Sequence, residues 1–157
     1  MNFCSKNLPL VLAVFLFLSV PSFAADGAEN VPAARHGVRI LFEGGEAVAV
    51  LYDTPPAEAF LRLLPLEVEF SDFAGAEKIF YLAEKLPVRG TPNADEQKGD
   101  FCYYAPWGNI AVFYKGYGHG KNLYVLGSLA SGKEKLAAMK QDFKARIEVL
   151  EEGKSNN

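Results

Sequence analysis

Cysteine and histidine are scarce in this chain of 157 residues, which contains two of each. Cys4 precedes an apolar N-terminal run that is expected to be removed, so the folded part keeps only Cys102 and cannot form an intramolecular disulfide. A single cysteine within a strand pattern is typical of a small buried apolar residue. His36 and His119 are far apart and lack the partner spacing of a zinc site. The sequence therefore predicts no metal, no cofactor and no disulfide.

The N-terminal apolar run is too short to cross a membrane. It extends from Leu8 to Val20, 13 residues, whereas a membrane-spanning helix needs about 20. Lys6 precedes the run, and the small residues Ser22 and Ala24 follow it at the spacing of a cleavage site. We therefore predict a signal peptide over residues 1–24, a flexible leader over 25–37, and a periplasmic or secreted protein.

Positive charge is also lacking. The chain has 16 basic and 19 acidic residues, and removal of Lys6 leaves 15 basic residues and a net charge of about −4. No basic run or arm is present, which argues against nucleic acid or an anionic membrane surface as a partner. A small molecule or a short peptide is the expected partner of what we predict to be a monomer.

Short segments with alternating apolar character dominate the rest of the chain. They predict about eight strands, of which residues 143–149 alternate most regularly. Asp53 or Thr54 can cap a short helix that begins near Pro55. Ser131, with Glu134 three residues later, has the spacing of a capping box and predicts a second helix. Many antiparallel strands in a short chain leave edges that a small closed barrel removes, so we predict such a barrel over 38–150 and a disordered tail over 151–157.

Four segments resemble the cyclophilin-like fold, and most of all the compact bacterial cyclophilin-like family. The resemblance covers about residues 38–150, and its longest segment has a run of aromatic residues around Pro106 and Gly108. It implies a mainly β protein, a closed eight-stranded antiparallel barrel with two short helices. The segments are LLPLEVEF (63–70), EKIFYL (77–82), GDFCYYAPWGNIAVFY (99–114) and LYVLGSLASGKEKL (123–136).

Resemblance to cyclophilins raises the possibility of prolyl isomerisation. In that reaction an arginine donates a hydrogen bond that helps the substrate amide to twist, against an uncatalysed barrier of about 18–20 kcal/mol. The corresponding strand here offers Glu77 and Lys78 but no arginine. Ala111 corresponds loosely to the active-site glutamine, and Phe113 to an aromatic wall of the proline pocket. The resemblance also implies a possible accessory role beside a flavodoxin-type redox partner.

The aromatic segment supplies the candidate site. Strand spacing alone directs about half of its aromatic residues into a core, but the corner at residues 106–109 is less constrained by packing. Such a corner is either purely structural or part of a groove in which Asn109 supplies a directional hydrogen bond. We expect ligand binding without an assigned catalytic residue, and keep a weak prolyl isomerase using Lys78, or an accessory interaction domain, as alternatives. The expected ligand-binding residues are Tyr103, Tyr104, Trp107, Asn109 and Phe113.

Overall fold

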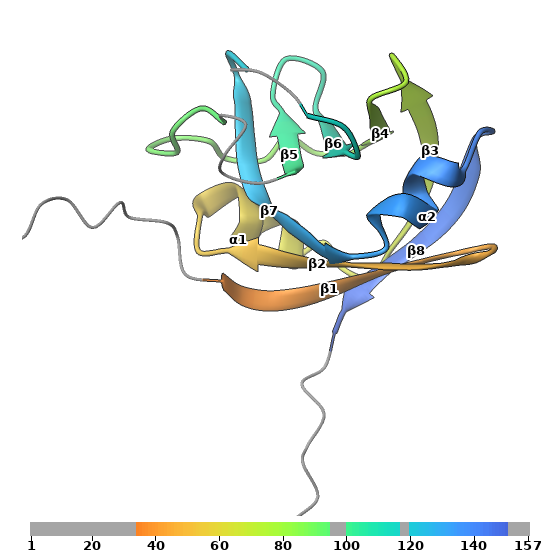
Figure 1. Cartoon of the computed structure of the whole chain (residues 1–157). Coiled ribbons are helices and arrows are strands. Elements are labelled where there is room, and N and C mark those ends of the chain that lie inside the picture. The colour runs from red at the N-terminus through yellow and green to blue at the C-terminus, as the bar shows by residue number, and fades with distance from the viewer. Residues whose placement is uncertain (1–33, 95–99, 117–119, 151–157) are drawn as a thin grey trace, which may run out of the picture. The chain divides into compact units, whose positions relative to one another are not determined.

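The computed structural model describes residues 34–94, 100–116 and 120–150, which form a closed antiparallel barrel (Figure 1). The order of strands around the barrel is β1-β2-β7-β5-β6-β4-β3-β8. This arrangement confirms the mainly β fold and the closed eight-stranded barrel with two short helices. The strands are β1 (Ala34–Phe42), β2 (Gly45–Tyr52), β3 (Leu66–Phe73), β4 (Glu77–Tyr81), β5 (Phe101–Tyr104), β6 (Asn109–Phe113), β7 (Leu123–Ser131) and β8 (Phe143–Val149); the helices are α1 (Pro55–Leu61) and α2 (Lys133–Ala138).

The last strand closes the barrel. β8 pairs with β1 on one side and with β3 on the other, so that Ile147 lies opposite both Ile40 and Leu66. β2 and β7 meet at Gly127, where an added Cβ would overlap the carbonyl oxygen of Val50. A glycine at this position therefore lets the two backbones approach closely.

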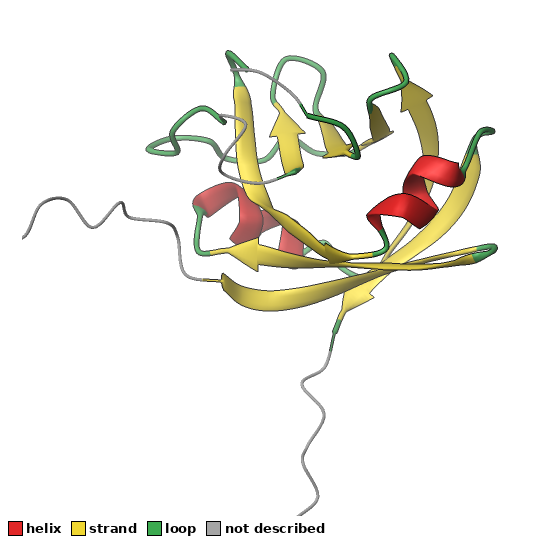
Figure 2. Cartoon of the chain, in the orientation of Figure 1, coloured by secondary structure: helices red, strands yellow, loops and turns green. Residues whose placement is uncertain are grey.

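Apolar side chains from all eight strands and both helices fill the barrel interior, which forms the main core of the described residues. Phe70 stacks on Phe143 with ring centroids 5.1 Å apart, and Phe60 of α1 packs against Phe101 at 5.5 Å. Leu136 is the buried residue of α2. Figure 2 shows the two helices at opposite sides of the barrel, and their buried side chains join this core.

The two helices begin in different ways. Thr54 caps α1, since its hydroxyl accepts a hydrogen bond from the amide of Ala57 at 3.4 Å, as expected. The capping box predicted for α2 is wrong, because Ser131 still pairs with Val48 in the β2–β7 ladder. Gly132 takes the N-cap position instead, with φ of 80° and no side-chain cap. A left-handed residue there turns the chain from strand to helix, which favours glycine.

The folded unit also starts earlier than predicted. β1 begins at Ala34, so residues 34–37 belong to the barrel and not to the leader. Backbone pairing explains the extension, since Gly37 lies opposite Val50 and its carbonyl accepts from Leu150, and such bonds need no particular side chain. The predicted signal peptide (residues 1–24), residues 25–33, His119 and the predicted tail (151–157) lie outside the described residues. No helix in the described part of the chain is long and apolar enough to span a bilayer.

Candidate functional site

The outer face of β4, β5 and β6 carries a second apolar cluster. Successive residues of a strand point to opposite faces, so the neighbours of the interior residues Phe80 and Ile110 face outward. The segment around Ala94 covers part of this face, because its amide donates to the carbonyl of Leu123 at 2.7 Å. The barrel wall is thus buried on both sides here. The outer cluster consists of Ile79, Ala94, Cys102, Ala111, Phe113, Leu123 and Val125.

A groove of about 260 Å³ opens beside this outer cluster, and we call it the outer groove. The Trp107 ring lies between two other aromatic rings, with centroids 5.5 Å from both Phe73 and Tyr104. Both pairs are edge-to-face, at interplanar angles of 82° and 79°. Trp107 remains 51% exposed and Phe73 39%. The described residues that line the groove are Phe73, Glu77, Ile79, Tyr104, Trp107, Asn109, Ala111, Phe113, Gly120 and Leu123.

Four of the five predicted site residues line this groove: Tyr104, Trp107, Asn109 and Phe113. Tyr103 lies elsewhere, fully buried in the barrel interior, where its hydroxyl accepts a hydrogen bond from the amide of Leu86 at 3.2 Å. The alternation of side chains along β5 separates it from Tyr104. Tyr103 is therefore a core residue and no part of the groove.

Sequence reasoning did not assign Glu77 and Phe73 to the site. They face each other across the β3–β4 ladder, and Glu77 also lies opposite Phe113 of β6. The available signal was the position of Glu77 two residues before Ile79, which places both on one face of β4. Glu77 therefore brings a carboxyl group into a predominantly apolar groove.

The polar groups of the groove are unusual. Burial raises the pKa of Glu77 from 4.5 to about 7, because the apolar surroundings disfavour its charged form. Asn109 is only 2% exposed, and its Oδ1 atom has no hydrogen-bond partner among the described residues. Its Nδ2 atom donates to the carbonyl of Ile110 at 3.3 Å. A buried acceptor without a partner is energetically costly, so a hydrogen-bond donor brought within reach of this oxygen would be favoured.

Lys78 does not reach the outer groove. It is 1% exposed and on the opposite face of β4, where Nζ donates to Asp72 Oδ1 at 2.7 Å and to the carbonyl of Met139. The Tyr114 ring lies 5.4 Å from the same nitrogen. The hydrogen bond from Lys78 is the main cause of the lowered pKa of Asp72, while burial and the hydrogen bond to Asp72 raise the pKa of Tyr114 to about 12. This cluster ties β3, β4 and the end of α2 together.

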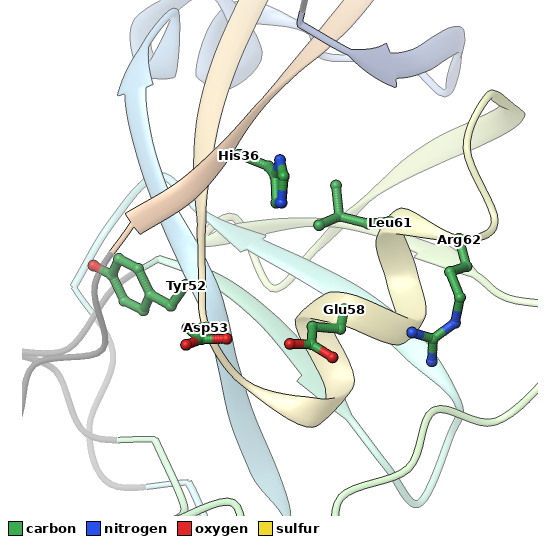
Figure 3. A pocket seen from close by; sticks show the side chains of 6 residues that line it. All are labelled: His36, Tyr52, Asp53, Glu58, Leu61 and Arg62. Atoms are coloured by element: carbon green, nitrogen blue, oxygen red, sulfur yellow. The ribbon is translucent and has the colours of Figure 1, made fainter.

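A second hollow, of about 220 Å³, lies where β1, β2 and α1 meet (Figure 3). Its described side chains include the imidazole of His36, the carboxyls of Asp53 and Glu58, and the guanidinium of Arg62. No group of three or more His, Cys, Asp or Glu residues within the described part of the chain is arranged to hold a metal ion. None of the predicted site residues lies in this hollow, so the outer groove is the stronger candidate.

The closed eight-stranded antiparallel barrel with two short helices has the architecture of a cyclophilin-like domain. The sequence pattern of the Cyclophilin-like family matches residues 40–148, and the chain belongs to that family. The resemblance noted from the sequence is thereby confirmed. The solution structure of a hypothetical protein from Archaeoglobus fulgidus is similar, with a TM-score of 0.53 and 19% identity over 78% of this chain and 98% of that one; it supports the fold alone. Comparison with curated protein sequences finds no match.

Proposed function

We propose that this domain binds a small molecule or a short peptide in the outer groove, and that it does not catalyse a reaction there. The observation that carries the proposal is the buried Oδ1 atom of Asn109, which lacks a partner among the described residues and lines a groove with exposed aromatic rings. Hydrogen bonding to a ligand would compensate for the desolvation of this oxygen.

The aromatic rings supply the second contribution to binding. Trp107 and Phe73 keep a large part of their surfaces in water, although they lie at the edge of an apolar cluster. Covering such rings is favourable by about 25 cal/mol per Å² of apolar surface. The volume of about 260 Å³ lies just below the range of about 300–1,000 Å³ that is common for ligand pockets, so the groove suits a small ligand or one to two side chains of a peptide.

The charges around the groove favour binding over prolyl isomerisation. Isomerisation by the cyclophilin route needs a cationic donor beside the substrate carbonyl, and the only formally charged side chain among the described lining residues is the acidic Glu77. The Lys78 ammonium, the cation considered as a substitute, is held by Asp72 on the opposite face of β4. An exchange measurement on a model X-Pro peptide should therefore show no acceleration by the protein.

The tryptophan provides a direct test of binding, because Trp107 is the single tryptophan of the chain. A panel of metabolites and short peptides is titrated while its emission is followed, and at least one ligand should change the emission with saturation. Asn109→Leu should weaken that ligand by about tenfold, since it removes the acceptor but keeps an apolar side chain of similar size. Tyr103→Phe, which changes only the barrel interior, is the matched control. An emission that stays constant across the whole panel would contradict the proposal.

The N-terminal sequence supports a second part of the proposal, namely that the protein acts outside the cytoplasm. The predicted signal peptide ends at Ala24, so the exported chain would begin at Ala25. Intact-mass measurement of the protein recovered from the periplasm or the medium tests this. Recovery of the uncleaved chain from the cytoplasm alone would overturn it.

A further inference from the structure

Three aromatic rings in contact with one another line the outer groove. Trp107 is in edge-to-face contact with both Phe73 and Tyr104, so each of these two rings stands at a steep angle to the indole and the three do not form a flat stack. Rings at such angles present π faces and edges in several directions within a small space. The negative face of an aromatic ring attracts a cation that lies within about 6 Å of its centre.

The polar groups of the groove favour a ligand that donates hydrogen bonds or carries a positive charge. Glu77 contributes a carboxyl group and Asn109 a carbonyl oxygen without a partner among the described residues. Both groups are stabilised by a hydrogen-bond donor or by a positive charge. No lysine, arginine or histidine is among the described residues that line the groove. Burial raises the pKa of Glu77. The other titratable side chain among the described lining residues is Tyr104. Among these described residues, an anionic ligand would therefore face a carboxylate with no compensating positive charge, whereas a cationic ligand would neutralise that carboxylate.

We propose that the ligand of the outer groove carries an alkylated ammonium group, which sits against Phe73, Tyr104 and Trp107 with Glu77 as its counter-charge. This inference deepens the proposed function and depends on it. Alkyl substituents matter because a bare ammonium is strongly hydrated, and its transfer into an apolar groove costs more than that of a quaternary nitrogen. The same chemical group occurs in free molecules such as choline and on methylated lysine side chains of peptides.

Choline and 3,3-dimethyl-1-butanol have nearly the same shape, but only choline is charged. A comparison of their affinities therefore isolates the contribution of the charge. Both are titrated into the full-length chain at pH 8.5 and constant ionic strength, with Trp107 emission and calorimetry as readouts. Choline should bind at least tenfold more tightly than the isostere. A peptide with a trimethyl-lysine flanked by glycines is titrated in the same way. If this peptide binds more tightly than choline, the natural ligand is a peptide side chain; if choline binds more tightly, the natural ligand is a free small molecule.

Two variants connect the preference to named residues. Glu77→Gln should reduce the preference for choline to less than about threefold while affinity for the isostere stays within twofold, because only the charge is lost. Glu134→Gln removes one negative charge from the exposed surface of α2 and should leave the preference unchanged. Phe73→Leu, which keeps the carboxylate, should weaken choline at least fivefold.

The outcomes also separate this inference from the proposed function. Equal binding of choline and the isostere, or a preference that survives in Glu77→Gln, would overturn the ammonium assignment and leave groove binding intact. Binding of another ligand class to the groove without any binding of choline would do the same. Failure of every ligand to alter the Trp107 emission would refute both.

Discussion

Replacing Glu77 with glutamine should make the protein more stable at alkaline pH and leave it unchanged in acid. The substitution keeps the size of the side chain and removes its ability to ionise. In the folded protein burial raises the pKa of Glu77 to about 7, whereas the unfolded chain has the ordinary value near 4.5. Below pH 4.5 the carboxyl is protonated in both states, so no difference from glutamine is expected there.

Between pH 4.5 and about 7 the unfolded chain ionises at this position while the folded protein retains its proton. The stability of the wild-type protein therefore falls as the pH rises through this window, and the loss is complete above the folded pKa. Each pKa unit corresponds to 1.36 kcal/mol, which sets an upper limit of about 3.4 kcal/mol. Because Glu77 lines an open groove and is partly solvated, we reduce this figure to about 1.5 kcal/mol.

Urea titrations followed by Trp107 emission at pH 4, 5.5, 7 and 8.5 measure this effect. Glu77→Gln should match the wild type at pH 4 and exceed its free energy of unfolding by about 1.5 kcal/mol at pH 8.5. Glu134→Gln, with the same change of charge on an exposed helix, should show no such divergence. A constant difference between Glu77→Gln and the wild type at all four pH values would refute the argument from burial.

Three further predictions follow from the same structure. Asp72→Asn leaves the buried Lys78 ammonium without its carboxylate, so it should lower the free energy of unfolding, measured by urea titration, by about 3 kcal/mol. Adding Lys78→Met to this variant should restore part of the loss. An Asp72→Asn variant as stable as the wild type would contradict this. Gly127→Ala should cost about 2 kcal/mol or more because β2 and β7 must separate, whereas Gly116→Ala, with open space around its Cβ, should cost less than about 0.5 kcal/mol. If the ammonium assignment holds, affinity for choline should rise by up to about thirtyfold from pH 5.5 to 8.5 as Glu77 ionises, and a calorimetric affinity independent of pH would argue against it.

Strand alternation predicted the fold well where one face of a strand meets water. In residues 143–149 the apolar and charged positions alternate, and β8 occupies that segment. The signal is weaker in β5, where Phe101, Cys102 and Tyr103 are all buried because the wall is covered on both sides. Without a polar face, the sequence does not indicate which of Tyr103 and Tyr104 points into the barrel. That ambiguity explains why Tyr103 was assigned to the groove.

The position of Lys78 could not be predicted from the sequence for a different reason. Its partner, Asp72, lies six residues earlier and meets it only through the register of β3 with β4. A local pattern contains no information about that register, so a lysine in a strand is expected at the surface. The next pair of the same ladder, one residue along each strand, brings Phe73 opposite Glu77 and completes the groove. The register between β3 and β4 therefore buries Lys78 and places Phe73 and Glu77 in the groove, and neither result can be predicted from local sequence.

The dual pairing of β8 also constrains how the chain can fold. Since β8 supplies the neighbour of both β1 and β3, a chain that ends before Phe143 would expose two unpaired strand edges at once. Contacts between the first and last strands have the greatest sequence separation in the domain and form slowly because a long loop must close. The barrel therefore cannot close until β8 has been synthesised, so a nascent chain exposes the edges of β1 and β3 until the last strand of the domain emerges.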